Sequence, residues 1–151
     1  MNLTKNKNCV AFEMQYYQII KIKGLNEHKI VDNYVVLIVK RRNGQILEGY
    51  VSLSKLERLT KLNWCWCASW KKNIKGYYLQ HTEYLGTVDG KPQYKIHALH
   101  QLIMPKKDGL VPDHINHNGL DNRDDNLRYL TNGENVKHSR RNELRQLHEN
   151  H

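Results

Sequence analysis

The residues best suited to chemistry lie between Asp113 and His138, in the run DHINHNGLDNRDDNLRYLTNGENVKH. This run combines an Asp-His pair, a loop rich in asparagine and a basic end that carries a further histidine. Carboxylate and amide oxygens suit a hard divalent cation, and a neutral imidazole can take a proton from water beside a phosphate. The residue types and their order therefore predict metal-dependent hydrolysis of a phosphodiester.

The surrounding pattern predicts the elements that must position this run. Short apolar stretches indicate two strands, separated by a loop in which asparagine, aspartate and glycine are frequent. Thr131 and Glu134 have the spacing of a capping box, which marks the start of a helix. The predicted order is a strand at Leu110–Pro112, a loop at Asn116–Asp125, a strand at 126–131 and a helix to about His148.

Residues 97–142 resemble the HNH nuclease family, in which two strands and one helix form a metal finger. The segments that carry the resemblance are HALHQLIM, VPDHINHNGLDNRDDNLRYLT and ENVKHSRR. The upstream WCWCASW–loop–GYYLQH pattern is similar to the β-rich region before this finger in small phage and intron-type enzymes, which extends the likeness to about residues 46–142. The expected fold class is α+β, with a basic β-rich DNA-binding lobe at residues 1–94 and an HNH ββα-metal nuclease finger at residues 95–151.

The resemblance implies a role for each polar residue of the run. His114 takes the place of the general base, and Asn126 that of the asparagine that orients it. Asp113 and Asn135 take the places of the metal ligands, expected to hold Mg²⁺ or Mn²⁺, although many relatives have histidine at the helix position. His138, on the same helix face as Asn135, is a secondary candidate to touch the metal, the leaving oxygen or a phosphate. The implied products carry 5′-phosphate and 3′-hydroxyl ends.

Several nearby residues have weaker assignments. Asn122 could also help to orient the base, and Gly119 is expected to permit a turn that is strained for other residues. His100 is more typical of packing between helix and finger. A zinc site is the competing interpretation for the metal, but Cys65 and Cys67 form CxC and lack the CxxC spacing of a structural finger.

The positive charge of the chain is unevenly placed. The formal net charge is +9; residues 1–94 carry 15 Lys+Arg against 7 Asp+Glu, whereas residues 95–151 carry 9 against 8 and seven of the nine histidines. Residues 1–94 are therefore predicted to hold a polyanion, expected to be double-stranded DNA, and residues 95–151 to act on it. The alternative is that the basic surface only keeps the protein in solution. The expected phosphate contacts are Lys40, Arg41, Arg42, Lys71 and Lys72 in the first part, and Arg123, Arg128, Lys137, Arg140 and Arg141 around the finger.

The first lobe is predicted to be mainly β, built around Trp64, Trp66 and Trp70 with one helix. Asn43-Gly44 predicts a hairpin, and Ser54 with Glu57 resembles a capping box at the start of the helix. The predicted elements are a strand or short helix at 11–20, strands at 33–39, 46–53, 64–70 and 76–81, a helix at Lys55–Leu62, a turn at Asp89-Gly90, then QYKIHAL and an ALHQLIM helix ended by Pro105.

These observations predict a metal-dependent DNA endonuclease that nicks one strand, as a monomer or weak dimer without an obligate protein partner. The alternative is a DNA-binding protein that keeps the scaffold but does not cleave, and a third possibility is a nuclease that prefers RNA. The chain has no run of about 18 apolar residues and no apolar N-terminal region, so we expect neither a membrane span nor secretion. Three cysteines, an odd number, argue against a disulfide framework and fit a cytoplasm, that of a bacterial host if the protein is phage-encoded.

Overall fold

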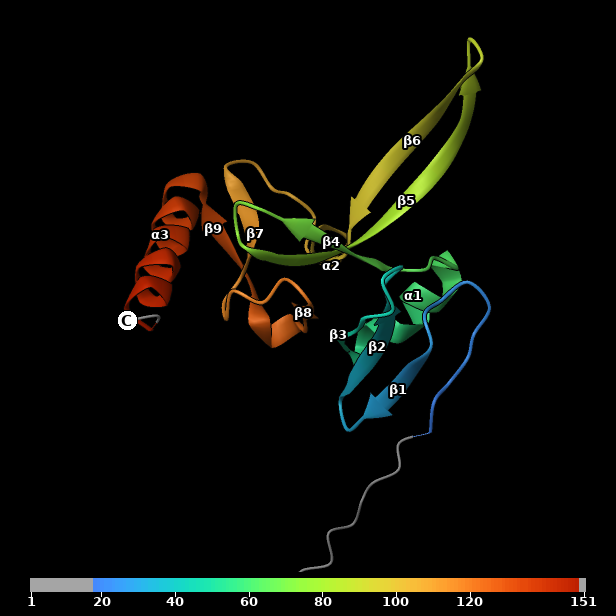
Figure 1. The fold of residues 1–151 in the computed structure, drawn as a ribbon, viewed down its shortest axis with the longest axis horizontal. Helices are drawn as coiled ribbons and strands as arrows, with labels where there is room; N and C mark the ends of the chain where they lie inside the picture. Colours follow the sequence, from blue (N-terminus) through green and yellow to red (C-terminus); the bar gives the residue numbers. More distant parts are fainter. Residues whose placement is uncertain (1–17, 150–151) are drawn as a thin grey trace, which may run out of the picture.

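The computed structural model describes residues 18–149, which adopt an α+β fold (Figure 1). The expected α+β class is confirmed. The expected element over 11–20 lies mostly outside the described residues. Within residues 18–149, none of the helices has the length and apolar character needed to cross a bilayer.

The first sheet is built on an apolar hairpin. The β-branched run 34–39 pairs with the next strand in antiparallel register, with Lys40 opposite Ile46, so the predicted Asn43-Gly44 hairpin is confirmed. Gly44 takes a positive φ of 85°, and the Asn43 side chain accepts a hydrogen bond from the Gln45 backbone at 3.0 Å. The strands in spatial order are β1 (His28–Val31), β2 (Tyr34–Lys40), β3 (Ile46–Ser52) and β8 (Asp121–Asn122), the last of which is parallel to β3.

The first helix, α1 (Leu56–Leu62), forms close to its predicted position, but the expected capping box is wrong. A 3-10 turn over Leu53–Lys55 precedes the helix, so Ser54 lies inside helical backbone instead of at an extended cap position. Glu57 instead forms an ion pair with Lys61, one turn along the helix, at 2.7 Å. The Ser54–Glu57 pattern therefore does not cap the helix.

In the second sheet, the first strand starts later than predicted and the second strand is longer than predicted. The strand predicted from Trp64 begins only at Cys67, because the Trp66 backbone is bound by the side chain of Asn26, which accepts from its N–H at 2.7 Å and donates to its C=O at 2.9 Å. The strand predicted over 76–81 continues much further and forms a long hairpin arm that extends away from the body (Figure 1). The three antiparallel strands are β4 (Cys67–Lys71), β5 (Gly76–Val88) and β6 (Lys91–Ala98).

The core lies where the two sheets and two short helices meet. Leu37, Trp66, Leu79 and Leu99 are fully buried there and come from segments far apart in the sequence. The expected tryptophan core is only partly correct, because Trp70 is 54% exposed while Trp66 is 1% exposed.

The C-terminal part forms the expected strand, loop, strand and helix. The capping box is confirmed, since the Glu134 carboxylate accepts from the Thr131 backbone at 2.9 Å and the Glu134 backbone donates to the Thr131 hydroxyl at 3.3 Å. The predicted loop is more ordered than expected and contains β8 and a 3-10 turn at Asp124–Asn126. The elements are α2 (Leu99–Ile103), β7 (Leu110–His114), β9 (Leu127–Thr131) and α3 (Asn132–Glu149), with β7 antiparallel to β9.

The two parts of the chain are joined through both sheets. Strand β6 runs through residues 94 and 95, where the boundary between the lobes is expected, and β8 from the C-terminal loop pairs with β3. The division of labour between a binding lobe and a nuclease lobe stays a prediction. In structural terms, the C-terminal loop is held in place by strands from the first part.

Candidate active site

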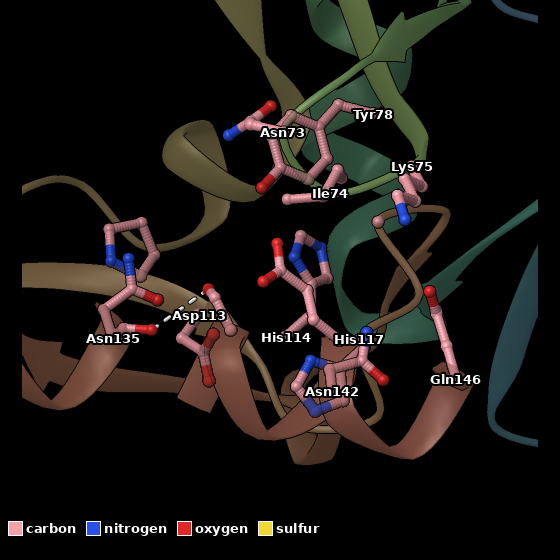
Figure 2. A pocket seen from close by; sticks show the side chains of 14 residues that line it. Asn73, Ile74, Lys75, Tyr78, Asp113, His114, His117, Asn135, Asn142 and Gln146 are labelled. Atoms are coloured by element: carbon pink, nitrogen blue, oxygen red, sulfur yellow. Dashed lines mark hydrogen bonds between the residues drawn. The ribbon is translucent and has the colours of Figure 1, made fainter. Parts of the chain in front are cut away.

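One pocket brings together residues from three separate elements. It has a volume of about 120 Å³ and is bordered by the turn between β4 and β5, the end of β7 and one face of α3 (Figure 2). Asp113, His114 and Asn135 all line it. The residues expected to activate water and hold a metal are therefore gathered at one place.

His114 is held in a defined orientation at the end of β7. Its side chain is buried, and Nε2 lies 3.1 Å from Oδ1 of Asn122. The Asn122 amide nitrogen donates to the Gly119 carbonyl at 3.4 Å, which turns its oxygen toward the imidazole. Because an amide oxygen can only accept, Nε2 carries the proton and the lone pair lies on Nδ1.

The surroundings of His114 favour its neutral form. Tyr78 stacks on its ring at a centroid distance of 5.6 Å, and His100 meets it edge-on at 5.0 Å. Burial lowers the pKa of His114 below its ordinary value of 6.5, although Asn122 and the nearby carboxylates oppose the shift. Burial also lowers the pKa of His100 to about 3, in keeping with the packing role expected for it. At neutral pH both imidazoles are uncharged.

Asn126 ties the loop together rather than touching the imidazole. Its amide nitrogen donates to the Asp121 carbonyl at 2.8 Å and to the Asn116 side chain at 2.9 Å, and its oxygen accepts from the Asn116 backbone at 3.1 Å. The direct partner of His114 is Asn122, to which the sequence assigned only a supporting role. The regular spacing of asparagines indicated a polar loop, but not which of them would reach the base.

Asp113 is engaged by two basic side chains. Arg128 donates to Oδ2 at 3.0 Å, and Nδ1 of His138 lies 3.2 Å from Oδ1. His138 in turn stacks on His117 at a centroid distance of 3.8 Å. Arg128 is therefore bound to the candidate metal ligand, whereas the sequence indicated a contact with DNA phosphate.

The donor set fits a hard cation that keeps most of its water. Residues 18–149 contain no cluster of three or more His, Cys, Asp or Glu arranged to hold a metal. Asp113 provides an anionic oxygen and Asn135 a neutral amide oxygen, and both residues line the pocket. An ionised carboxylate has about four acceptor sites, of which Arg128 and His138 occupy two. Mg²⁺ accepts such a sparse set because it dehydrates reluctantly.

Arg123 is paired with Asp121 in the structure, and its contact with phosphate stays a prediction. Its guanidinium forms two hydrogen bonds with Asp121, at 2.9 and 2.8 Å, and lies over the ring of Tyr34 at 5.3 Å. Burial raises the pKa of Asp121, but the hydrogen bonds from Arg123 outweigh burial and hold that pKa below its usual value. This pair anchors the asparagine-rich loop to the first sheet.

The remaining basic candidates divide into paired and exposed side chains. Lys40 binds Glu27 at 2.8 Å, Arg41 binds Gln45 at 2.6 Å, and Lys71 donates to Gln80 at 3.2 Å. Each of these contacts is at or near the surface and leaves the cation open to exchange for a phosphate. Arg42, Lys72, Lys137, Arg140 and Arg141 are exposed, the last three on α3.

Gly119 is needed for a reason other than the expected one. The left-handed backbone of this loop belongs to His117, with a φ of 60°, and not to Gly119. A Cβ on Gly119 would instead collide with the carbonyl oxygen of Tyr77 and the ring of Tyr78. The glycine therefore allows the loop to pack directly on β5.

We expect Gly119→Ala to destabilise the protein by about 1–3 kcal/mol, the usual cost of forcing extra atoms into a packed site. Gly133→Ala is the matched control, because no atom lies within 4 Å of its added methyl group in α3. Alanine should raise or maintain stability there. Thermal unfolding of both variants checks the prediction, and equal melting temperatures would contradict the proposed close packing.

Comparison with known proteins supports the resemblance carried by the sequence. Residues 98–137 match the family described as HNH endonuclease. No curated protein and no solved structure matches the chain. The matched segment contains Asp113, His114, Asn122, Asn126 and Asn135, and ends one residue before His138.

Proposed function

We propose that the protein is a metal-dependent endonuclease that hydrolyses phosphodiester bonds of DNA, because residues 98–137 match the HNH endonuclease family. The family itself indicates nuclease activity and a DNA substrate. The dependence on Mg²⁺ or Mn²⁺, the nicking of one strand and the roles of individual residues are our proposal.

The observation that carries this proposal is the fixed imidazole of His114. Its Nε2 is bound to Asn122 at 3.1 Å, so its basic nitrogen is Nδ1, and Asp113 and Asn135 line the same pocket. A buried histidine with one nitrogen tied and a lowered pKa is suited to accept a proton at neutral pH. Its placement beside a carboxylate and an amide supports hydrolysis over simple binding.

In the proposed reaction, His114 accepts a proton from a water molecule through Nδ1. The water oxygen forms a bond to phosphorus while the bond from phosphorus to the 3′ oxygen breaks, which leaves 5′-phosphate and 3′-hydroxyl ends. Asp113 and Asn135 would hold Mg²⁺ or Mn²⁺, and such an ion offsets negative charge that develops at the phosphate. One pocket acts on one strand, so a single protein molecule nicks the duplex.

A catalytically silent DNA-binding protein is the second candidate. The observation that favours it is the engagement of both Asp113 oxygens, by Arg128 and His138. If these contacts persist on DNA, the carboxylate stays neutralised by the protein and the scaffold binds without cutting.

A plasmid assay separates the candidates. Supercoiled DNA is incubated with the protein and Mg²⁺, Mn²⁺, Ca²⁺ or Zn²⁺, with EDTA as the control, and single-stranded RNA is digested in parallel. We expect open-circular product with Mg²⁺ or Mn²⁺ that disappears in EDTA. Binding without nicking in every metal would favour the silent protein, and faster loss of RNA would change the substrate class.

The basic residues of the first part are expected to supply most of the salt sensitivity of DNA binding. Replacing five of them with serine should weaken binding and flatten the slope of log affinity against log salt, by about 0.9 for each phosphate that is no longer neutralised. Turnover at saturating DNA should survive, because the pocket is unchanged. Fluorescence anisotropy over a salt series measures the slope, and an unchanged slope would show that α3 holds the substrate instead. The five residues are Lys40, Arg41, Arg42, Lys71 and Lys72.

A further inference from the structure

The turn between β4 and β5 forms a second wall of the pocket. Asn73, Ile74 and Lys75 line the same cavity as Asp113 and His114, and Figure 2 shows them on the side opposite α3. This turn lies outside the segment that matches the nuclease family. It therefore adds to the site groups that neither the family nor the sequence pattern assigns.

The turn is held over the pocket by the residues that follow it. Tyr78, at the start of β5, stacks on His114 at 5.6 Å. The loop at Gly119 packs so closely on Tyr77 and Tyr78 that a single added carbon would collide with them. These contacts hold the beginning of β5 against the loop at Gly119. They therefore also hold the β4–β5 turn, which directly precedes β5.

Lys75 differs in charge from every other residue in the pocket lining. It is the one lysine or arginine among the lining residues that the structure describes. The nearby arginines Arg123 and Arg128 are bound by Asp121 and Asp113, whereas no ion pair to Lys75 occurs within residues 18–149. An ammonium group without an ion pair, in the lining of the same pocket as the candidate water-activating histidine, is placed to meet an anion.

The backbone at Lys75 is part of the hairpin turn, in which the N–H groups of Ile74 and Lys75 donate to the carbonyls of Lys71 and Lys72, each at 3.3 Å. Its φ is 47°, in the left-handed region where glycine and asparagine are common and lysine is not. The exposed side chain gains no burial from this position. Lys75 thus combines a backbone conformation that the hairpin turn requires with an exposed cation in the pocket lining.

We propose that Lys75 binds a phosphate of the DNA strand being cut, so that the β4–β5 turn completes the active site from outside the nuclease segment. This inference rests on the proposed endonuclease function. An ammonium group acts on phosphate as a point charge and is most effective where the surrounding walls limit access of water. Charge on the phosphate oxygens increases as the water oxygen attacks, so the contact contributes to turnover as well as to binding.

The test compares three full-length variants in the plasmid assay with Mg²⁺. Lys75→Ala should lower turnover at saturating DNA by about 10-fold or more, as loss of a charge-stabilising donor does. Lys75→Arg should recover most of that loss, because it keeps the charge. Lys91→Ala, an exposed lysine beyond the far end of β5, should match the wild type. A Lys75→Ala protein that turns over within twofold of the Lys91→Ala protein would overturn the inference while leaving the nuclease function intact.

A second readout does not depend on cleavage. Lysine side chains are labelled with an amine-reactive reagent, with and without saturating duplex DNA in EDTA, and each site is quantified by mass spectrometry. Lys75 should become protected by DNA while Lys91 stays reactive. Unchanged labelling of Lys75 at saturating DNA would refute the contact. Protection of Lys75 in a protein that never nicks would instead refute the proposed function and keep the phosphate contact.

Discussion

Replacing His114 with alanine should slow DNA cleavage by about 10²–10⁴-fold, the usual contribution of general-base catalysis. The imidazole lines the pocket and is tied at Nε2 by the Asn122 amide oxygen at 3.1 Å. DNA affinity should be nearly unchanged, because the neutral side chain adds no charge to the binding surface. Single-turnover nicking rates at saturating protein measure the loss.

The matched control for this variant is His148→Ala. His148 is exposed in the last turn of α3, and its removal should leave the rate unchanged. Thermal unfolding of the His114→Ala protein shows whether the buried site still folds. Nicking within a few-fold of the wild type in a folded His114→Ala protein would remove His114 from the mechanism.

The second large effect concerns the metal ligands. Asp113→Ala and Asn135→Ala should each abolish Mg²⁺-supported cleavage and weaken Mg²⁺ binding measured by calorimetry. With so few protein ligands, each oxygen contributes a large share of the affinity. His138→Ala should have a smaller effect, because its Nδ1 contacts Asp113 and its loss leaves both proposed ligand oxygens in place.

Asn132→Ala provides the control for the helix position. Asn132 is the exposed first residue of α3, three residues before Asn135, and lies outside the pocket lining. It should bind Mg²⁺ like the wild type. If His138→Ala removes Mg²⁺ binding while Asn135→Ala keeps it, the assignment of the helix ligand is wrong and His138 takes its place.

The sequence alone predicted the local parts of this protein well. The apolar run 34–39, the Asn43-Gly44 turn and the Thr131–Glu134 capping box each depend on residues within a few positions of one another, and each forms as expected. The position of the Asp-His pair at the end of a strand was also predictable, since Asp113 and His114 directly follow the apolar residues of β7. Short-range hydrogen bonds and side-chain periodicity predicted these features, although the similar Ser54–Glu57 pattern did not form a capping box.

The tertiary structure decided which partner each polar group finds. Asn122, and not Asn126, reaches His114; Arg128 turns to Asp113; and Asn26 ends the strand expected at Trp64 by binding the backbone of Trp66. Each contact depends on how distant segments pack, which spacing along the chain does not encode.

The pocket wall formed by the β4–β5 turn is another feature that spacing along the chain does not predict. Lys75 is separated from His114 by all of β5, β6 and α2, and reaches the pocket because Gly119 lets the loop pack on Tyr77 and Tyr78. The sequence therefore predicted the candidate reacting groups and the local elements that carry them. Packing between the sheets decided that Lys75 shares a pocket with these groups, because electrostatic contacts depend on distance in space and not on position in the chain.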